Sequence, residues 1–275
     1  VWHVEPDPNL NQIASNNHAL LKTTNIKHVV LTAEKFLASE KKYDWIFIDP
    51  SRKSNGRKVI RLTDCEPDVT KLLEAALSKS ENILIKTSPL LDLTEGLKHM
   101  PGTANVFVVS VENECKEVLF MMQKGFMGEP TIICENLPFR EQSFKFSFTE
   151  EETAESRFEE PRQFIYEPNA SILKAGAFKS LAQKTGLSKI AASTHIYTSK
   201  ELHPGFPGRI FKNLGELDAP TKQLPESRAN VISRNHPLSP DQIKKKFKLK
   251  DGGEKYVLAF SGQRKKYLLV AERIN

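Results

Sequence analysis

The sequence predicts an α/β protein with a mostly parallel, doubly wound sheet, followed by smaller α+β units. Over the first 140 residues, short apolar runs alternate with segments of helical periodicity. The run WIFI at 45–48 has no polar alternation, as expected of a strand that helices cover on both faces. Near Phe139 the pattern changes to alternating aromatic and polar residues, which indicates a second type of unit.

The apolar runs of the first part are predicted strands at 1–5, 26–32, 43–49, 82–88, 104–112 and 130–136. A helix is predicted over 7–21, because Asp7 can cap it, Pro8 suits its first turn, and apolar residues recur at helical spacing. That apolar set is Leu10, Ile13, Ala14 and Leu21. A second helix is predicted over 66–79, with one apolar face made of Val69, Leu72, Leu73, Ala76 and Leu77.

The strands at 43–49, 82–87 and 104–111 are expected to be parallel neighbours on one side, with the strands at 1–5 and 26–32 paired on the other. The two groups should leave a gap between them or close directly on each other. The second part begins with an acidic run, TEEETAES at 149–156, which is predicted to be an exposed helix start. A strand, an Asn169 cap, a helix and a Gly186 stop follow. The chain ends with a strand at 228–235, a helix opened by Ser239 and Pro240, and a hairpin over 254–274.

The amino-acid composition limits which classes of protein the chain can belong to. The 275 residues are 39% hydrophobic and 27% charged, which is typical of a globular chain of about two domains. No apolar run reaches the roughly 20 residues that span a bilayer, so no membrane partner is expected. The three cysteines lie far apart and the seven histidines lack ligand spacing, so we expect no metal and a cytoplasmic location.

The basic charge is concentrated in the C-terminal fifth. The formal net charge is +6, yet residues 220–275 hold thirteen lysines and arginines against five acidic residues. That segment is therefore +8 and the rest of the chain −2. Such a segment indicates either a polyanion partner or a solvated lysine surface.

Polar residues follow the predicted parallel strands, where ligands of open α/β sheets bind. Glu5 ends one strand and is followed at once by a capped helix, which places a carboxylate well for ribose hydroxyls. Asp49 and Pro50 end the buried strand with a carboxylate and a rigid carbonyl. Lys86 either contacts a substrate anion or reaches solvent, and Cys115 is a nucleophile candidate or a structural thiol.

These residues carry a resemblance. Glu5 at a strand end, DPSR at 49–52 and NILIKTSP at 82–89 resemble strands two to five of the class I S-adenosylmethionine-dependent methyltransferase fold. The runs FIDPSRKS, YEPNASILKAGAF, FPGR and KLKDGGEKYVLAF are similar to a bacteroidete family of methyltransferases. That family has a ferredoxin-like insert and a C-terminal THUMP-like domain, and the resemblance covers essentially the whole chain. YEPNASILKAGAF is its most specific segment.

The resemblance implies a domain order and residue roles. It implies a Rossmann-like methyltransferase domain over 1–140, a ferredoxin-like domain over 141–205 and a THUMP-like domain over 206–275. Glu5 would hold the cofactor ribose, and Thr32, Ala33 and Glu34 would lie against the adenine. The catalytic loop would be the one that positions a nucleophile near the methyl group, and Asp49 would also face the cofactor. Its residues are Asp49, Pro50, Ser51 and Arg52.

Two departures from the family pattern qualify these roles. Ser51 replaces the second proline of the DPPR or NPPY loop, which puts an amino-methylating mechanism in doubt. The fold's first strand and glycine-rich loop, which allow close approach of the cofactor, should precede the Glu5 strand. The chain opens on the second strand, so we expect an N-terminally truncated domain that alone binds cofactor poorly and is inactive.

The expected reaction is methyl transfer from S-adenosyl-L-methionine, and the expected partner is RNA, such as tRNA or rRNA, because THUMP domains serve RNA modification. Two rivals stay open: a methyltransferase of a small molecule or protein, and a non-catalytic RNA-binding module. The lysines of a short helix and the basic residues of the last hairpin turn would contact RNA if they share one surface. They are Lys244, Lys245, Lys246, Lys248, Lys250, Arg264, Lys265 and Lys266.

Overall fold

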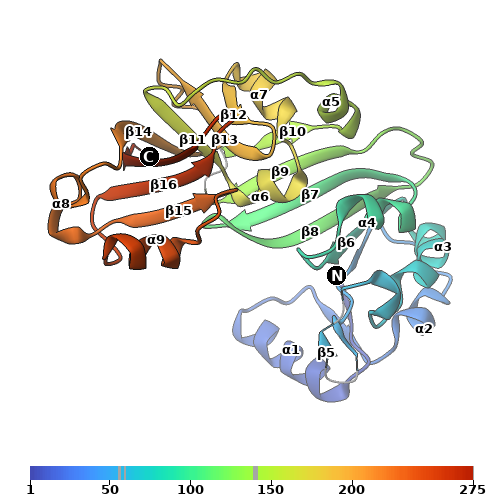
Figure 1. Ribbon diagram of the computed structural model, residues 1–275. Helices are drawn as coiled ribbons and strands as arrows, with labels where there is room; N and C mark the ends of the chain where they lie inside the picture. The colour runs from blue at the N-terminus through green and yellow to red at the C-terminus, as the bar shows by residue number, and fades with distance from the viewer. Residues whose placement is uncertain (55–56, 59, 139–141, 275) are drawn as a thin grey trace. The chain divides into compact units, whose positions relative to one another are not determined.

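The structure is a computed structural model that describes residues 1–54, 57–58, 60–138 and 142–274. The chain divides into two compact units. Unit 1 comprises Val1–Phe107 and Glu117–Pro130, and unit 2 comprises Val108–Lys116 and Thr131–Asn275. Figure 1 labels the elements of both units. Within the described residues, no helix is both long enough and apolar enough to cross a bilayer.

Unit 1 opens with two short parallel strands and their helices. These elements are β1 (Trp2–Val4), α1 (Pro8–Leu20), β2 (Lys27–Val29) and α2 (Ala33–Leu37). β1 and β2 pair in parallel from Trp2 opposite Lys27, which confirms the predicted pairing. Helix α1 begins after Asp7 because that carboxylate accepts the backbone N–H groups of Asn9 and Leu10. The predicted start of α1 is therefore also confirmed.

The packing of α1 differs from the expectation. Its apolar residues face outward: Leu10 is 53% exposed and Ile13 is 55% exposed. The helix instead buries Asn11, whose Nδ2 donates to the carbonyl of Val29 at 3.0 Å. The apolar periodicity thus predicted the helix correctly and its buried face wrongly, because a side chain to backbone hydrogen bond fixes the helix on β2.

A six-stranded sheet has the strand order β10-β9-β7-β8-β6-β3, and its strands β9 and β10 belong to unit 2. β3 and β6 are parallel, as predicted, but β8 lies between β6 and β7 and runs antiparallel to β6. The expectation that the strand at 104–111 lies beside the strand at 82–87 is therefore wrong. The cause is a two-residue turn at Glu112 and Asn113, both with positive φ, which folds β8 back on β7. The strands are β3 (Trp45–Ile48), β6 (Asn82–Thr87), β7 (Thr103–Val111), β8 (Glu114–Gln123), β9 (Thr131–Leu137) and β10 (Phe144–Phe146).

Helices cover this sheet unevenly. In α3 (Val69–Lys79), Val69, Leu72, Leu73 and Ala76 are buried, as the periodicity predicts. On β3, by contrast, Trp45 is 53% and Phe47 is 58% exposed, so this strand is not covered on both faces. The remaining elements of unit 1 are β4 (Lys53–Ser54), β5 (Arg57–Lys58), the 3-10 helix η1 (Leu62–Asp64) and α4 (Leu93–His99).

Unit 2 contains a continuous seven-stranded sheet with the order β12-β13-β11-β14-β17-β16-β15. β11 pairs with both β13 and β14, so the domain boundary that we predict at 205/206 falls inside one sheet. The strands are β11 (Phe164–Pro168), β12 (Ser188–Ala191), β13 (Thr194–Ser199), β14 (Gly208–Glu216), β15 (Asn230–Arg234), β16 (Lys255–Ser261) and β17 (Lys266–Arg273). The helices are α5 (Phe148–Thr153), α6 (Ala170–Ala175), α7 (Lys179–Thr185), α8 (Pro220–Gln223), the 3-10 helix η3 (Pro225–Ser227) and α9 (Pro240–Phe247).

Strands near the two ends of this order also contact each other. The Thr194 hydroxyl on β13 donates to the carbonyl of Ser261 on β16 at 2.6 Å. Asn235, just after β15, donates to the same hydroxyl at 3.1 Å. The sheet therefore curls on itself around an apolar interior that includes Ile165, Phe211, Leu258, Phe260 and Tyr267.

The acidic run of unit 2 forms a helix start, as predicted, but one of its carboxylates is not simply solvated. Glu151 of α5 accepts the backbone N–H groups of Phe178, Lys179 and Ser180 at 2.8–3.0 Å. These groups lie at the first turn of α7, where N–H groups have no partner within the helix. Glu151 therefore anchors α7 to α5.

Candidate functional site

The predicted catalytic loop lies at the carboxyl ends of β3 and β6. Ile48 pairs with Ile85, so the next residues, Asp49 and Lys86, are neighbours on adjacent parallel strands. Their side chains form an ion pair, with Asp49 Oδ2 2.6 Å from Lys86 Nζ. Lys86 thus contacts the candidate catalytic carboxylate. The lysine could have been assigned this role from the sequence only if the strand register had been known.

The loop that follows Asp49 is held by its backbone. Pro50 is buried, and Ser51 exchanges two backbone hydrogen bonds with Glu66, of 2.7 and 3.1 Å. Arg52 then reaches β8, where its guanidinium lies 3.7 Å from the Glu117 carboxylate. Glu117 escapes sequence reasoning because β8 was not predicted to run beside β6. The four named loop residues are therefore fixed at one edge of the sheet.

The predicted cofactor residues lie at the carboxyl ends of β1 and β2. Glu5 continues β1, with its backbone N–H 3.2 Å from the Val29 carbonyl, and its carboxylate accepts the Asp7 N–H at 2.9 Å. Thr32 caps α2 by accepting the Lys35 N–H, and Ala33 and Glu34 form the first turn. Because β1 and β2 are parallel, these groups share one edge.

The chemistry of this edge suits a nucleoside. The half-buried Glu5 carboxylate has one oxygen engaged by Asp7 and keeps acceptor capacity for ribose hydroxyls. The start of α2 offers backbone N–H groups to ring nitrogens. β1 and β2 form a sheet of their own, separate from the sheet that contains β3 and β6. The structure thus brings the predicted residues together as two groups.

Three histidines that the sequence did not single out cluster under α1. His3 on β1 lies opposite His28 on β2, and His18 of α1 covers them. Their ring centroids are 5.0–5.9 Å apart, and His18 Nδ1 lies 3.2 Å from His28 Nε2. Burial, followed by His3 and His18, lowers the pKa of His28. Over the described residues, no group of three potential ligands is placed to hold a metal ion.

The cysteines show no sign of nucleophilic activation. Cys65 and Cys134 are buried free thiols, and burial raises the pKa of both. Cys115 is half-buried on β8.

The predicted RNA-binding lysines are spread along α9 and beyond it. Lys244 is held between Asp241 and Asp251, each at 3.0 Å, and the hydrogen bonds to Asp251 and Asp241 raise its pKa. Lys248 ends the helix in a left-handed conformation, and Lys250 pairs through its backbone with the segment at Arg228. Of these lysines, Lys244 is therefore already neutralised by carboxylates.

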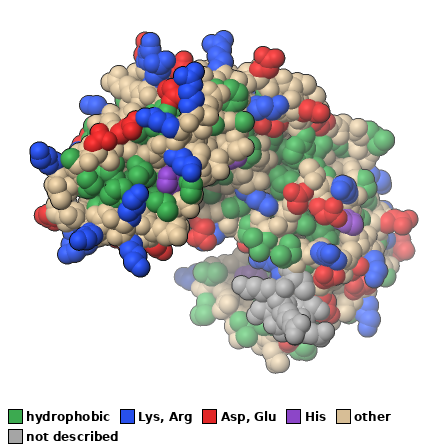
Figure 2. Space-filling view, viewed as in Figure 1, with side chains coloured by type: hydrophobic (Ala, Val, Ile, Leu, Met, Phe, Trp, Pro, Cys, Tyr) green, Lys and Arg blue, Asp and Glu red, His purple; other side chains and the backbone are tan. Residues whose placement is uncertain are grey.

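The helix lysines and the hairpin-turn residues do not meet. β15 and β16 are parallel, so the intervening α9 returns the chain to the start of β16, where Lys250 binds Ser227 and Ala229. The turn between β16 and β17 lies at the other end of β16, where Ser261 pairs with Lys266. Figure 2 shows lysine and arginine side chains dispersed over the region of β15, β16 and α9, with acidic ones among them. Within the described residues, the two clusters therefore do not meet the condition of sharing one surface.

Comparisons with known proteins agree with this architecture. The chain is 20% identical over 212 residues to uncharacterized S-adenosylmethionine-dependent methyltransferases of two Mycobacterium tuberculosis strains. The match covers 74% of this chain and 56% of those proteins, so the chain spans about half the length of the curated relatives it matches. A Porphyromonas gingivalis W83 protein that carries the name methyltransferase has a similar crystal structure. Its TM-score is 0.88 at 29% identity, over 100% of this chain and 71% of that one.

Two family models match the second part of the chain. Residues 164–207 match a ferredoxin-like domain, and residues 209–273 match a THUMP domain-like family. The first range contains β11 to β13 and the second contains β14 to β17, so the two matches share the seven-stranded sheet of unit 2. The chain thus has homologues among S-adenosylmethionine-dependent methyltransferases, shares the fold of a methyltransferase structure, and carries ferredoxin-like and THUMP-like domains.

Proposed function

We propose that the whole protein transfers a methyl group from S-adenosyl-L-methionine to RNA in the cytoplasm, with the chemistry at the edge of unit 1. The Asp49–Lys86 ion pair at the ends of two parallel strands is the observation that carries this proposal. It places a carboxylate where open α/β sheets bind ligands, in the loop that resembles the nucleophile-positioning loop of methyltransferases. The names of the relatives support the same reaction class.

The bound cofactor supplies an electrophilic methyl group on a sulfonium. The residues of this chain would hold and orient the reactants, and orientation accounts for much of the barrier reduction in a displacement between two bound groups. Glu5 would accept hydrogen bonds from the ribose hydroxyls, and the segment from Thr32 to Glu34 would line the adenine. Asp49 would accept a hydrogen bond from the nucleophile. Lys86 and the 3.7 Å contact of Arg52 with Glu117 would keep Asp49 and its loop in place.

We also propose that a further strand completes the sheet of unit 1 in the whole protein. β1 and β3 are end strands of two separate sheets, so each leaves one edge unpaired within the described strands. Exposed apolar side chains on β3 (Trp45, Phe47) and on α1 (Leu10, Ile13) supply the surface that such a strand would cover. This strand and the loop after it would join the ribose edge to the catalytic edge.

The RNA part of the proposal rests on unit 2. Its THUMP domain-like match points to RNA, and the chain's excess positive charge lies within that range. We therefore divide the protein as a methyltransferase domain over 1–140, a ferredoxin-like domain over 141–205 and a THUMP-like domain over 206–275. The last two share one sheet and are proposed to act together.

Cofactor binding tests the proposal most simply. In the whole protein, Glu5→Ala should weaken S-adenosylmethionine binding by about 1–3 kcal/mol, the scale of a lost charge-assisted hydrogen bond. Glu40→Ala, an exposed glutamate of the same unit, is the matched control and should bind like the parent. Calorimetry that gives the same affinity for the parent and Glu5→Ala would contradict the ribose assignment.

Substrate assays separate the rival functions. Transfer of labelled methyl groups to total RNA supports the proposal, whereas transfer only to protein or small-molecule fractions favours another methyltransferase class. RNA binding by a whole protein that shows no cofactor binding would favour a non-catalytic RNA-binding module.

A further inference from the structure

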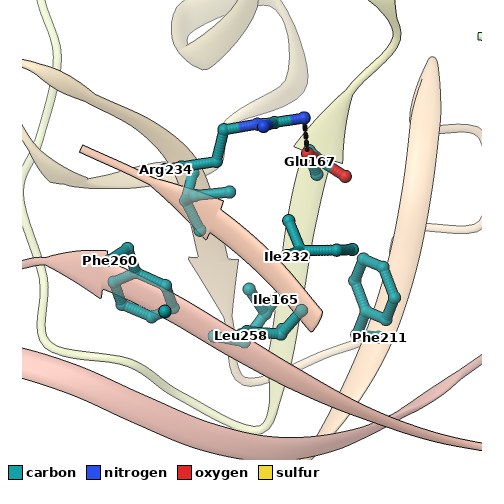
Figure 3. A pocket seen from close by; sticks show the side chains of 9 residues that line it. Ile165, Glu167, Phe211, Ile232, Arg234, Leu258 and Phe260 are labelled. Atoms are coloured by element: carbon teal, nitrogen blue, oxygen red, sulfur yellow. Dashed lines mark ion pairs between the residues drawn. The ribbon is translucent and has the colours of Figure 1, made fainter. Parts of the chain in front are cut away.

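A buried carboxylate holds two guanidinium groups at one end of the curled sheet in unit 2. Glu167, in the YEPN segment on β11, is 1% exposed. Its Oε2 accepts the Arg209 Nε–H at 2.7 Å, and its Oε1 lies 2.7 Å from Arg234 Nη2. Figure 3 shows the Arg234 side chain extending from its strand toward Glu167. Two cations share one anion, so the cluster has an excess of one positive charge.

Both arginines remain accessible from outside. Their side chains are 25% and 41% exposed for Arg209 and Arg234, although the carboxylate between them is buried. The Arg234 Nε–H is itself buried and has no hydrogen-bond partner among the described residues. A guanidinium carries five N–H donors, so each arginine keeps donors beyond those that Glu167 accepts. Because both side chains are partly exposed, some of these remaining donors lie at the surface, whereas the Arg234 Nε–H stays buried.

The turn between β16 and β17 lies next to the end of β15 that carries Arg234. Arg234 pairs with Phe260, Phe260 pairs with Tyr267, and Ser261 pairs with Lys266 one step further along. The turn that carries Arg264 and Lys266 therefore adjoins the end of β15. The four cationic residues Arg209, Arg234, Arg264 and Lys266 are called the arginine rim below.

The arginine rim differs from the lysines of α9 in how its cations are held. Within the described residues, neither Arg264 nor Lys266 has an ion-pair partner. In the same turn Lys265 is paired with Glu216, and on α9 Lys244 is paired with two aspartates. Lys245, Lys246 and Lys248 likewise have no ion-pair partner within the described residues, so the rim differs from α9 in that Glu167 holds two of its cations, Arg209 and Arg234, in position.

The space behind the rim limits what can bind there. The cavity beneath Glu167 and Arg234 has a volume of about 10 Å³ and is lined by apolar side chains such as Ile165, Ile232 and Phe260 (Figure 3). A cavity of that size holds about one water molecule. A nucleobase cannot enter it, so a nucleic acid would contact the rim through its backbone. Guanidinium forks match phosphate geometry, and arginine is favoured where such groups are recognised.

We propose that the arginine rim binds phosphates of the RNA backbone, and that Glu167 is a positioning residue that fixes Arg209 and Arg234 for this contact. The proposal deepens the proposed function, since it rests on RNA being the substrate. It gives the YEPN segment a role: its glutamate orients the phosphate-binding arginines across the ferredoxin-like and THUMP-like parts of one sheet.

The test compares two triple variants that remove equal charge from opposite ends of β16. Fluorescence anisotropy measures binding of a labelled RNA hairpin of about 20 nucleotides to the full chain at several salt concentrations. Each lost phosphate contact should flatten the slope of log affinity against log salt by about 0.7–0.9. Arg234→Gln/Arg264→Gln/Lys266→Gln should therefore flatten it by about two units, and Lys245→Gln/Lys246→Gln/Lys248→Gln by less than about one. Equal flattening in both variants, or none in the rim variant, would overturn the proposal.

A single substitution separates positioning from bulk charge. Glu167→Gln raises the net charge by one, so simple attraction predicts tighter RNA binding. Loss of orientation predicts weaker binding, by about tenfold if one charge-assisted contact is lost. Tighter binding by a folded Glu167→Gln protein would refute the positioning role. If circular dichroism shows that this variant does not fold, Arg234→Lys keeps the charge without the fork and should bind more weakly at an unchanged salt slope; parent-like affinity would refute the role.

The outcome can be separated from that of the proposed function. The rim variants should bind S-adenosylmethionine like the parent when both are studied in the whole protein. If RNA binding depends on the rim but the protein transfers no methyl group, the rim proposal stands and the proposed methyltransferase function is wrong. If the rim variants transfer methyl groups to RNA like the parent, the proposed methyltransferase function stands and the rim proposal is wrong. Inorganic phosphate at matched ionic strength should compete only weakly, because an RNA backbone contacts several cations of the rim at once. Complete competition would contradict the contact of the rim with several phosphates of one RNA backbone.

Discussion

Two carboxylate–cation clusters, one in each unit, differ in how firmly they are held. In unit 1, Asp49 and Lys86 have side chains that are 44% and 25% exposed, and Arg52 meets Glu117 only at 3.7 Å. In unit 2, Glu167 is 1% exposed and binds two arginines. An open pair in water contributes little to stability and can exchange partners, whereas a buried carboxylate must keep its partners. The exposed pair in unit 1 suits a site where Asp49 accepts a hydrogen bond from a substrate. The buried cluster in unit 2 suits a fixed support for its two arginines.

The packing around the two clusters also differs, and unit 2 is again the more buried of the two units. Unit 1 exposes apolar side chains at Leu10, Ile13, Trp45 and Phe47, while Tyr166, Tyr197, Phe211 and Phe260 of unit 2 are buried to 1% exposure or less. Both tryptophans belong to unit 1 and four of the five tyrosines to unit 2. Tryptophan fluorescence and tyrosine near-ultraviolet dichroism can therefore follow the two units separately.

The largest expected effect comes from removing the buried carboxylate. Glu167→Ala should destabilise unit 2 by about 3 kcal/mol, because it leaves two guanidinium groups without their buried partner. Asp49→Ala, which breaks an open pair, should change the stability of unit 1 by less than about 1 kcal/mol. Urea unfolding followed by the tyrosine and tryptophan signals measures both. Equal losses of unfolding free energy in the two units would show that burial does not make the Glu167 cluster more important for stability than the Asp49–Lys86 pair.

Helix caps give a smaller, matched comparison. Asn169 caps α6 while 2% exposed, and Asp7 caps the exposed start of α1. Asn169→Ala should cost about 2 kcal/mol, near the upper end for caps, because it also leaves buried N–H groups unsatisfied. Asp7→Ala should cost about 0.5–1 kcal/mol, since water replaces the lost acceptor. If Asp7→Ala lowered the free energy of unfolding more than Asn169→Ala in the same urea experiment, unit 2 would not be the more firmly packed unit.

The pH dependence of stability sharpens the comparison further. Burial, and secondarily Lys189, lowers the pKa of His195 in unit 2 from 6.5 to about 4. The unfolded chain therefore takes up a proton at higher pH than the folded one. The resulting stability is complete above pH 6.5 and is lost as the pH falls toward about 4. His195→Gln should flatten this loss in the tyrosine signal; an unchanged pH profile would refute the assignment.

The histidine cluster of unit 1 should make stability depend on pH in the same direction. The pKa of His28 is lowered by burial and then by His3 and His18, so the stability of unit 1 should also fall as the pH drops below 6.5. His28→Gln should reduce that fall in the tryptophan signal without altering the tyrosine signal. A fall of equal steepness in parent and variant would show that His28 does not contribute to it.

Local sequence patterns predicted much of this fold and little of its long-range contacts. Apolar runs predicted β3, β6, β7 and the parallel pairs β1–β2 and β3–β6, because strand formation and burial follow local composition. β8 was missed because its position depends on a two-residue turn of positive φ. The Asp49–Lys86 contact depends on strand register, and Glu167 joins residues 42 and 67 positions away in the chain. Neither contact has a local periodic signal.

The apolar pattern of α1 gives the opposite lesson. It predicted a helix that exists, but its apolar side chains are exposed while Asn11 is buried. Periodicity predicts which face of a helix is apolar, but it does not predict whether another element of the chain covers that face. The same reasoning explains why Trp45 and Phe47 read as fully buried strand residues and are exposed.

Methyl transfer by the whole protein tests the account most directly. Transfer from labelled S-adenosylmethionine to RNA would be compared for the parent, Asp49→Asn and the control Asp44→Asn, which changes an exposed aspartate at the opposite end of β3. Asp49→Asn should abolish transfer while calorimetry still detects cofactor binding, and Asp44→Asn should transfer like the parent. Parent-like transfer by Asp49→Asn would contradict the assignment of the catalytic edge.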